Sequence, residues 1–321
     1  MDNQRRVIAL GFFDGVHLGH GALLRRVAQR AAELDARPCA FTFDQSPAAA
    51  LTGRAVPLLT GVDDRAGLME TLYGIREVIV APFALLRDMD WRDFVEGYLR
   101  REHGAVHVVA GHDFHFGRGG EGNPVRLAEE CARLGIGCDI IPRVELDGVT
   151  VSSTHIRGLV ERGELEAAAR FLGHPFVLSG PVVHGSELGR TLGTPTANLL
   201  IPQGVIAPGF GVYAAKVEVL PVCPDNHEPP GPRHVPGKGP YLAVTNVGVR
   251  PTVNASGAGV TVEPWILDFE GDLYGRTLRL ELYRRLRPER RFSGVDELRS
   301  AILENAAQTR AYFAAKERAS C

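Results

Sequence analysis

The sequence predicts an α/β domain followed by an all-β domain that ends in a helix, and three observations support this fold class. First, apolar runs typical of strands alternate with helical patterns through the first half of the chain. Second, after Gly173-His174-Pro175 the pattern changes to short β-branched or aromatic runs separated by glycine and proline, which is typical of an antiparallel barrel or sandwich. Third, a length of 321 residues allows about two domains of roughly 150 residues each. We therefore expect one domain over residues 1–173 and a second over 174–321.

The first half of the chain predicts a doubly wound parallel sheet, because strands that alternate with helices form βαβ units. The expected strands are residues 7–10, 39–43, 77–81, 106–110 and 138–141. The spacing of apolar residues predicts helices over 21–34, 65–73, 91–103 and 124–134, and a last helical segment over 153–172. Ligands of such sheets bind at the carboxyl ends of the strands.

The second half predicts antiparallel strands over residues 177–183, 211–220, 241–247, 260–268 and 277–286. A helical pattern over 295–313 follows, with Ser293 as its expected N-cap. The proline-rich stretch 221–240 is interpreted as an extended or mobile loop, with a solvated insertion favoured over a functional lid. The basic run 284–291 is interpreted as a solvated strand end.

Composition excludes several classes of protein. A net charge of −2 gives no electrostatic reason to expect nucleic acid or an anionic membrane as partner. The five cysteines are scattered without a C-x-x-C pair, which predicts reduced thiols rather than a zinc site or disulfides. The apolar stretch near the start breaks at Asp14 and is too short for a signal peptide core or a membrane span. We expect a cytoplasmic protein, and its oligomeric state stays open.

The most informative segment is residues 11–20, Gly-Phe-Phe-Asp-Gly-Val-His-Leu-Gly-His, between an expected strand and an expected helix. Such a turn aims backbone N–H groups and a helix dipole at a phosphate. The glycines let the backbone approach closely, and the two histidines of H-x-G-H add side-chain donors. A lone histidine here would favour a buried structural role, but the whole run favours a nucleotide site.

Two further segments fit the same site. Residues 111–117 follow the strand 106–110, so they lie at the same edge of the sheet. The run Ser152-Ser153-Thr154-His155-Ile156-Arg157 opens a helix with hydroxyls and an arginine one turn later, which suits an anion. Each segment is a weak signal by itself, and the ordered set of three is strong.

In this order the segments resemble the adenylyltransferase module of bacterial bifunctional riboflavin kinase/FMN adenylyltransferases, a family of H-x-G-H nucleotidylyltransferases. The resemblance implies that the FMN phosphate attacks the α-phosphorus of ATP in line, without a covalent enzyme intermediate. It implies that the catalytic histidines are His17 and His20 and that the flavin contacts Asp113 and Phe114. It also implies that ATP and the leaving pyrophosphate bind Gly11, Phe13, Asp14, Gly15, Gly19, Ser153, Thr154 and Arg157. The chain departs from the family where it has Gln45-Ser46-Pro47 in place of the usual Pro-His-Pro.

The second half carries its own candidate site. Residues 185–193 form a glycine-spaced loop, and glycines admit phosphates to backbone N–H groups. Thr196 and Asn198 follow, and their oxygens two residues apart can face a hard cation such as Mg²⁺. On an alternating strand, Glu263 shares a face with Trp265 and Leu267. By itself such a carboxylate is either a paired structural residue or a general base, and the structural role is favoured.

The motifs G-R-x-L-G-x-P-T-A-N, N-V-G-x-x-P-T and V-E-x-x-I-L-D-F-x-G-D-L-Y-G resemble the riboflavin kinase module, a small antiparallel barrel. The resemblance implies that Thr196 and Asn198 coordinate Mg²⁺ and that Glu263 accepts the proton of the riboflavin 5′-hydroxyl, which attacks the γ-phosphate. It also implies that ATP binds Gly189, Arg190 and Gly193. Trp265 stands where the family usually has histidine.

The sequence therefore predicts a bifunctional enzyme that uses riboflavin, FMN and ATP as substrates and a divalent cation as cofactor. The second domain would convert riboflavin to FMN, and the first would convert FMN to FAD and pyrophosphate. One alternative is a riboflavin kinase whose first domain is inactive or regulatory. Another is a flavin-binding or regulatory protein without turnover.

Overall fold

The computed structural model describes residues 5–184, 194–220, 239–249 and 260–320. Contacts between Cα atoms divide the chain into two compact units, residues 1–155 and 156–321. The segment between residue 156 and the predicted boundary at residue 173 is grouped with the second unit. Most of the predicted proline-rich loop, residues 221–238, lies outside the described residues.

The first unit contains a five-stranded parallel sheet in the order β3-β2-β1-β4-β5. The chain passes from β1 to β2 and β3 on one side, then returns to β4 and β5 on the other. A crevice at the carboxyl ends is expected where the strand order reverses, between β1 and β4. The predicted parallel sheet is confirmed, with strands β1 (Arg6–Leu10), β2 (Arg37–Phe43), β3 (Glu77–Ala81), β4 (Ala105–Gly111) and β5 (Gly137–Ile141).

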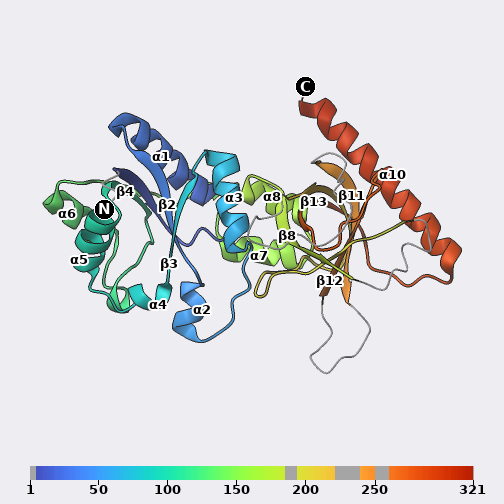
Figure 1. Ribbon diagram of the computed structural model, residues 1–321, viewed down its shortest axis with the longest axis horizontal. Coiled ribbons are helices and arrows are strands. Elements are labelled where there is room, and N and C mark those ends of the chain that lie inside the picture. Colours follow the sequence, from blue (N-terminus) through green and yellow to red (C-terminus); the bar gives the residue numbers. More distant parts are fainter. Residues whose placement is uncertain (1–4, 185–193, 221–238, 250–259, 321) are drawn as a thin grey trace. The chain divides into compact units, whose positions relative to one another are not determined.

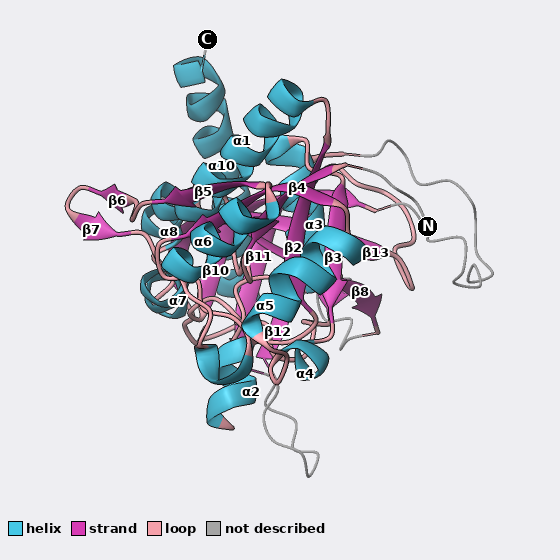
Figure 2. Ribbon diagram, turned by 90° about the vertical axis from the view of Figure 1, so that its left-hand side faces the viewer, coloured by secondary structure: helices cyan, strands magenta, loops and turns pink. Residues whose placement is uncertain are grey.

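Helices cover both faces of this sheet (Figure 1, Figure 2). Consecutive residues of β1, Val7, Ile8 and Ala9, are fully buried, as expected because successive side chains point to opposite faces. The predicted helix 91–103 is present as α5 followed without a break by a π-helical segment, η1. The helices are α1 (Leu18–Leu34), α2 (Pro47–Thr52), α3 (Val62–Tyr73), α4 (Phe83–Leu86), α5 (Trp91–Asp93), η1 (Phe94–Glu102), η2 (Arg118–Gly120) and α6 (Pro124–Leu134). A short hairpin of β6 (Glu145–Leu146) and β7 (Val149–Thr150) completes the unit.

The second unit contains a closed barrel in the order β10-β11-β12-β9-β8-β13, and its strand pairs are antiparallel. Of the barrel and the sandwich that the pattern allowed, the barrel is the one formed. The two-residue strand β9 was not expected, and it closes the barrel between β12 and β8. The strands are β8 (Phe176–Val183), β9 (Asn198–Leu199), β10 (Gly211–Val219), β11 (Tyr241–Val249), β12 (Val260–Ile266) and β13 (Thr277–Pro288).

The predicted helical segment 153–172 consists of two helices, α7 (Ser153–Glu161) and α8 (Leu165–Leu172). The break falls at Gly163, whose φ of 74° lies in the left-handed region that glycine adopts at low cost. A Cβ atom at this position would lie 2.5 Å from the hydroxyl of Tyr213 on β10. A contact with the barrel thus requires glycine here, and helical periodicity cannot reveal such a contact.

The chain ends in a long helix, α10 (Val295–Ser320), as predicted. The Glu297 carboxylate accepts hydrogen bonds from the backbone N–H of Ser293 at 2.9 Å and from its hydroxyl at 2.7 Å. These bonds tie the chain that precedes the helix to its first turn. Within the described residues, no helix has both the length and the apolar character needed to span a membrane.

Candidate functional site

A cavity of about 650 Å³ lies at the carboxyl edge of the parallel sheet. Its walls come from the segments that follow β1, β4 and β5 and from the first turns of α1 and α7. The topology thereby brings three separate sequence segments to one place. The predicted site residues that line the cavity are Gly11, His17, Gly19, His20, Asp113, Phe114, Ser153 and Thr154.

The turn between β1 and α1 has a strained backbone. Phe13 and Val16 have φ of 58° and 43°, in the left-handed region where a residue other than glycine loses roughly 1–3 kcal/mol. Both side chains are fully buried, and the Val16 N–H donates to the Phe13 carbonyl at 3.0 Å. Such strain persists only where the surroundings fix it, and it concentrates at binding turns. Phe13 and Gly15 themselves lie outside the lining of the cavity.

Asp14 is the residue that fixes this turn. It is buried, and its carboxylate accepts from the backbone N–H groups of Leu59 at 2.7 Å and Thr60 at 3.2 Å. The Thr60 hydroxyl in turn accepts from the Gly15 N–H at 3.0 Å, and the Ser153 hydroxyl donates to the Asp14 carbonyl at 3.0 Å. Asp14 therefore connects the turn to the segment before α3 and to the start of α7.

His17 is the N-cap of α1, because its Nδ1 accepts from the His20 N–H at 3.3 Å. A nitrogen that accepts a hydrogen bond carries no proton, so the neutral ring carries its proton on Nε2. His17 also lines the cavity, so this donor and the positive end of the helix dipole act on the same space. The arrangement suits an anionic group such as a phosphate.

His20 stacks on His17, with ring centroids 3.6 Å apart and planes 11° apart. The edge of the Phe13 ring contacts it, with a centroid separation of 5.1 Å. Burial, then the charges of His17 and Arg65, hold the pKa of His20 well below its ordinary value of 6.5. His20 is therefore a neutral imidazole at pH 7. Between the two histidines a residue with a Cβ atom would crowd the His17 ring at 3.1 Å, which explains Gly19.

Asp113 and Phe114 follow β4 and line the same cavity. The Asp113 side chain is 82% exposed, so its carboxylate is accessible to a ligand. Phe114 stacks on Phe116, with ring centroids 5.6 Å apart, and packs against the core of the unit. The pair thus supplies one polar and one apolar group to the wall.

The segment Gln45-Ser46-Pro47 forms the start of α2. The Ser46 hydroxyl caps the helix by accepting from the Ala49 N–H at 3.3 Å, and Pro47 is in its first turn. Pro47 lines the cavity. At the point of departure from the family pattern, the chain therefore contributes an apolar ring to the wall and uses the neighbouring hydroxyl for capping.

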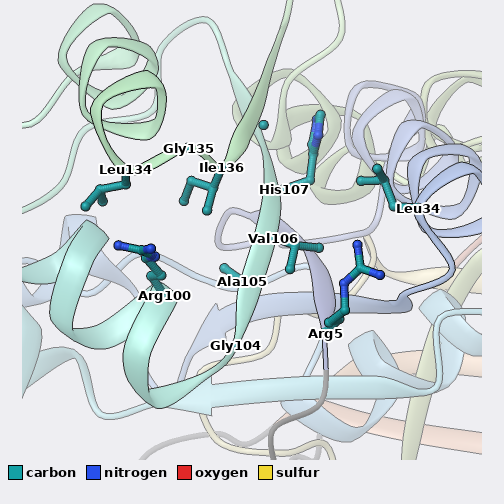
Figure 3. A pocket seen from close by; sticks show the side chains of 11 residues that line it. Arg5, Leu34, Arg100, Gly104, Ala105, Val106, His107, Leu134, Gly135 and Ile136 are labelled. Atoms are coloured by element: carbon teal, nitrogen blue, oxygen red, sulfur yellow. The ribbon is translucent and has the colours of Figure 1, made fainter.

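A second cavity, of about 530 Å³, lies at the opposite, amino edge of the sheet (Figure 3). Gly104–His107 and Gly137, at the starts of β4 and β5, line it together with Leu34 and Leu134, the last residues of α1 and α6. Helix carboxyl ends carry partial negative charge, which disfavours a triphosphate. The helix amino ends lie at the carboxyl edge of the sheet, where the predicted residues gather.

In the second unit, a cavity of about 250 Å³ is lined by residues of β11, β12 and α10. Glu263 on β12 and Asn246 on β11 are register partners, and both line it. Side chains at such positions are close neighbours on one face of the sheet. Trp265 lines the cavity as well and packs in one apolar cluster with Leu267, in agreement with the predicted alternation.

Thr196 lies beside β12, where it forms an isolated bridge with Trp265. The Ala197 N–H donates to the Pro264 carbonyl at 3.0 Å, and Leu199 pairs with Val262. This extended segment places the side chains of Thr196 and Asn198 on the same side. Thr196 lines the cavity with Glu263, and Asn198 is not among the lining residues.

The sequence did not identify Asn246, Arg287, Arg290 or Asn305 as site residues, but all four line this cavity. Arg287 Nε donates to Asn305 Oδ1 at 3.0 Å, and burial, more than the charge of Arg290, lowers the pKa of Arg287. The interpretation of the basic run 284–291 as a solvated strand end was thus wrong for Arg287, which is partly buried, whereas the Arg290 side chain is 52% exposed. The basic run itself was the feature of the sequence that could have identified Arg287 and Arg290 as site residues.

Two models of known protein families match the two halves of the chain that carry the two cavities. A family model described as FAD synthetase matches residues 1–155, and one described as riboflavin kinase matches residues 172–313. A bifunctional riboflavin kinase/FMN adenylyltransferase of Listeria monocytogenes is 34% identical over 316 residues, which cover 97% of this chain and 94% of that protein. The chain belongs to this family.

Other members are similarly close. The riboflavin kinase/FMN adenylyltransferase of Pseudomonas fluorescens is 35% identical over 309 residues, with 96% of this chain and 93% of that protein covered. A solved structure described as a macrolide-efflux protein from Streptococcus pneumoniae superposes with a TM-score of 0.79 at 28% identity, over 96% of this chain and 94% of the other. The fold of that structure therefore matches nearly the whole chain.

Four predicted phosphate-binding residues are not placed with the others. Gly189, Arg190 and Gly193 lie outside the described residues. Arg157 lies on α7 within the second unit. Their roles stay predictions.

Proposed function

We propose that the chain phosphorylates riboflavin in residues 174–321 and adenylylates the resulting FMN in residues 1–173. The observation that carries the adenylylation is the His17–His20 pair at the amino end of α1, in a cavity with Ser153 and Thr154. The observation that supports the phosphorylation is the cavity shared by Glu263, Asn246 and Thr196. The family models that match the two halves describe the same two activities.

In the adenylylation, an oxygen of the FMN phosphate attacks the α-phosphorus of ATP. The bond from the α-phosphorus to the bridging oxygen breaks, and pyrophosphate leaves with the electron pair. Such transfers depend mainly on positioning and on stabilisation of charge. His17 would donate from Nε2 to a phosphate oxygen, and Ser153, Thr154 and the amino end of α7 would hold the leaving group.

In the phosphorylation, the Glu263 carboxylate accepts the proton of the riboflavin 5′-hydroxyl while that oxygen attacks the γ-phosphorus and ADP leaves. Asn246, the register partner of Glu263, would orient the carboxylate. The oxygens of Thr196 and Asn198 fit Mg²⁺, which prefers hard oxygen ligands. When bound with ATP, the cation neutralises triphosphate charge.

We propose a cytoplasmic location for the enzyme, without nucleic acid or membrane partners. The support is the slightly negative net charge and the free thiols of Cys39, Cys131 and Cys138. Efflux, the activity in the name of the Streptococcus pneumoniae structure, is not proposed, because both family models that match the chain describe flavin enzymes.

Chromatography of flavins tests the proposal. Purified protein is incubated with ATP and Mg²⁺ and with either riboflavin or FMN. FAD from both reactions is expected. FMN that accumulates without FAD would support the kinase with a silent first domain, and no ATP-dependent conversion of either flavin would support the binding or regulatory alternative.

A further inference from the structure

Arg65 in the first turn of α3 is a buried cation beside the nucleotide cavity. Its side chain is only 1% exposed. Within the described part of the chain, no carboxylate lies within ion-pair distance of its guanidinium, and its Nε has no hydrogen-bond partner. Burial lowers the pKa of Arg65 to about 10, against the opposing effect of Asp14, so the group is still charged at pH 7. A buried charge of this kind costs several kcal/mol unless it is well compensated.

Most contacts of Arg65 converge on Phe12, and its Nη1 also donates to the Phe43 carbonyl at 3.4 Å. Its Nη1 donates to the Thr42 hydroxyl at 2.8 Å, and that hydroxyl donates to the Phe12 carbonyl at 2.8 Å. The guanidinium carbon also lies 4.3 Å from the centroid of the Phe12 ring, a cation–π contact. One arginine therefore fixes both the backbone and the ring of Phe12.

Phe12 is the residue through which these contacts reach the site. Phe12 lines the cavity, whereas Arg65 and Thr42 are not among its lining residues. It precedes the strained residues Phe13 and Val16 in the turn that ends at His17. A shift of Phe12 would move this turn, and misplacement of a catalytic group by about 1 Å can cost about 100-fold in rate.

We propose that Arg65 is a positioning residue for adenylyl transfer, which acts through Thr42 and Phe12 to hold the H-x-G-H turn in register with the bound triphosphate. The proposal rests on the adenylyltransferase activity proposed above. Its charge has a second effect, since a cation buried behind the turn adds positive potential to a site that binds polyanions. This added positive potential is a functional explanation for a buried guanidinium that has no ion-pair partner among the described residues.

The test uses the full-length enzyme and measures both activities of each variant. Arg65→Met removes the charge and the hydrogen bonds, and Arg65→Lys keeps the charge. Thr42→Val keeps the arginine but removes the hydroxyl that links its Nη1 to the Phe12 carbonyl. Arg76→Met is the matched control, because Arg76 is 85% exposed and pairs with Glu70 at the surface. Riboflavin phosphorylation serves as the internal measure of folded enzyme.

For FAD formation from FMN we expect Arg65→Met to lower kcat about 100-fold. The KM for ATP should change much less than kcat, and the kinase rate should stay within about twofold because that site lies in the other unit. Arg65→Lys should recover only part of kcat. The ammonium of lysine cannot stack on the Phe12 ring or donate hydrogen bonds from a planar group as a guanidinium does. Thr42→Val should lower kcat about tenfold, and Arg76→Met should match the parent.

Several results would overturn the proposal. These are an unchanged kcat in Arg65→Met, a rise in KM for ATP alone, or full recovery by lysine. If Arg65→Met does not fold, Thr42→Val decides, and wild-type FAD formation in that variant rejects the positioning role. Failure of the parent enzyme to form FAD would instead reject the proposed adenylyltransferase activity, so the two failures are distinguishable.

Discussion

The imidazole rings of His17 and His20 stack face to face, with centroids 3.6 Å apart. Two cationic rings would repel each other at this distance, and burial, followed by the charge of His17, holds the pKa of His20 low. The stack thus keeps two charges from lying side by side at the amino end of α1, because His20 is held neutral. Neutral rings can each donate one hydrogen bond, and the dipole of α1 supplies the positive potential.

The first prediction concerns this pair. His17→Ala combined with His20→Ala should lower FAD formation from FMN by about 10²–10³-fold or more, the loss typical of a removed donor to transition-state charge. Riboflavin phosphorylation should persist, because its candidate residues lie in the other unit. Separate assays with riboflavin and with FMN check this, and FAD synthesis at the parental rate would reject the assignment of the histidines.

The second prediction is the reciprocal one. Glu263→Gln keeps the shape of the side chain but cannot accept the proton of the 5′-hydroxyl, so FMN formation should fall by about 10²–10⁴-fold. Adenylylation of supplied FMN should remain. The same two assays measure it, and an equal loss of both activities would show that the substitution acts on the fold and not on one site.

The third prediction is a pH dependence of stability. The pKa of His20 lies below 6.5 in the folded unit, so the unfolded chain binds a proton first as the pH falls. Stability is therefore complete above about pH 6.5 and is lost as the pH falls toward the folded pKa. Burial also lowers the pKa values of His103 and His107, which act in the same direction.

The measurement is urea denaturation of the first unit between pH 7.5 and 5.5. The chain has two tryptophans, so in a Trp265→Phe background the fluorescence reports Trp91 alone. The midpoint should fall with pH, and it should fall less in His20→Gln. An equally steep fall in that variant would show that His20 is not the responsible group.

The fourth prediction separates a backbone effect from a steric one. Gly204 and Gly163 have φ of 81° and 74°, but a Cβ atom at residue 204 meets nothing within 4 Å, whereas one at residue 163 meets the Tyr213 hydroxyl. Gly204→Ala should cost about 1–2 kcal/mol for the left-handed backbone alone. Gly163→Ala should cost about 1–3 kcal/mol more, because the buried Tyr213 must move. Equal losses in urea denaturation would remove the clash as the cause of the break between α7 and α8.

Much of the candidate site could be predicted because its signals are local. The spacing of Gly15, His17 and His20 after an apolar run identifies a strand, a turn and a helix start within ten residues. The same holds for Ser153 and Thr154 at the start of α7. The parallel sheet then brings these segments to one edge, as βαβ connectivity requires.

The residues that support the site could not be predicted in this way. Arg65 lies 23 positions from Thr42, and Leu59 lies 45 positions from Asp14, so no periodicity connects them. In the barrel, Asn246 and Glu263 are neighbours only through the register of β11 and β12. An arginine in a helical pattern is usually exposed, and only the structure shows that this one is buried.

The sequence by itself determined the fold class, the order of the elements and the segments that carry chemistry, because these depend on residue spacing and turn chemistry over a few positions. The tertiary structure decided three further points: the closure of the barrel by β9, the break at Gly163, and the burial of Arg65 behind Phe12. Each of these depends on which distant residues meet in space, and on whether their packing can offset strain, a clash or an unpaired charge.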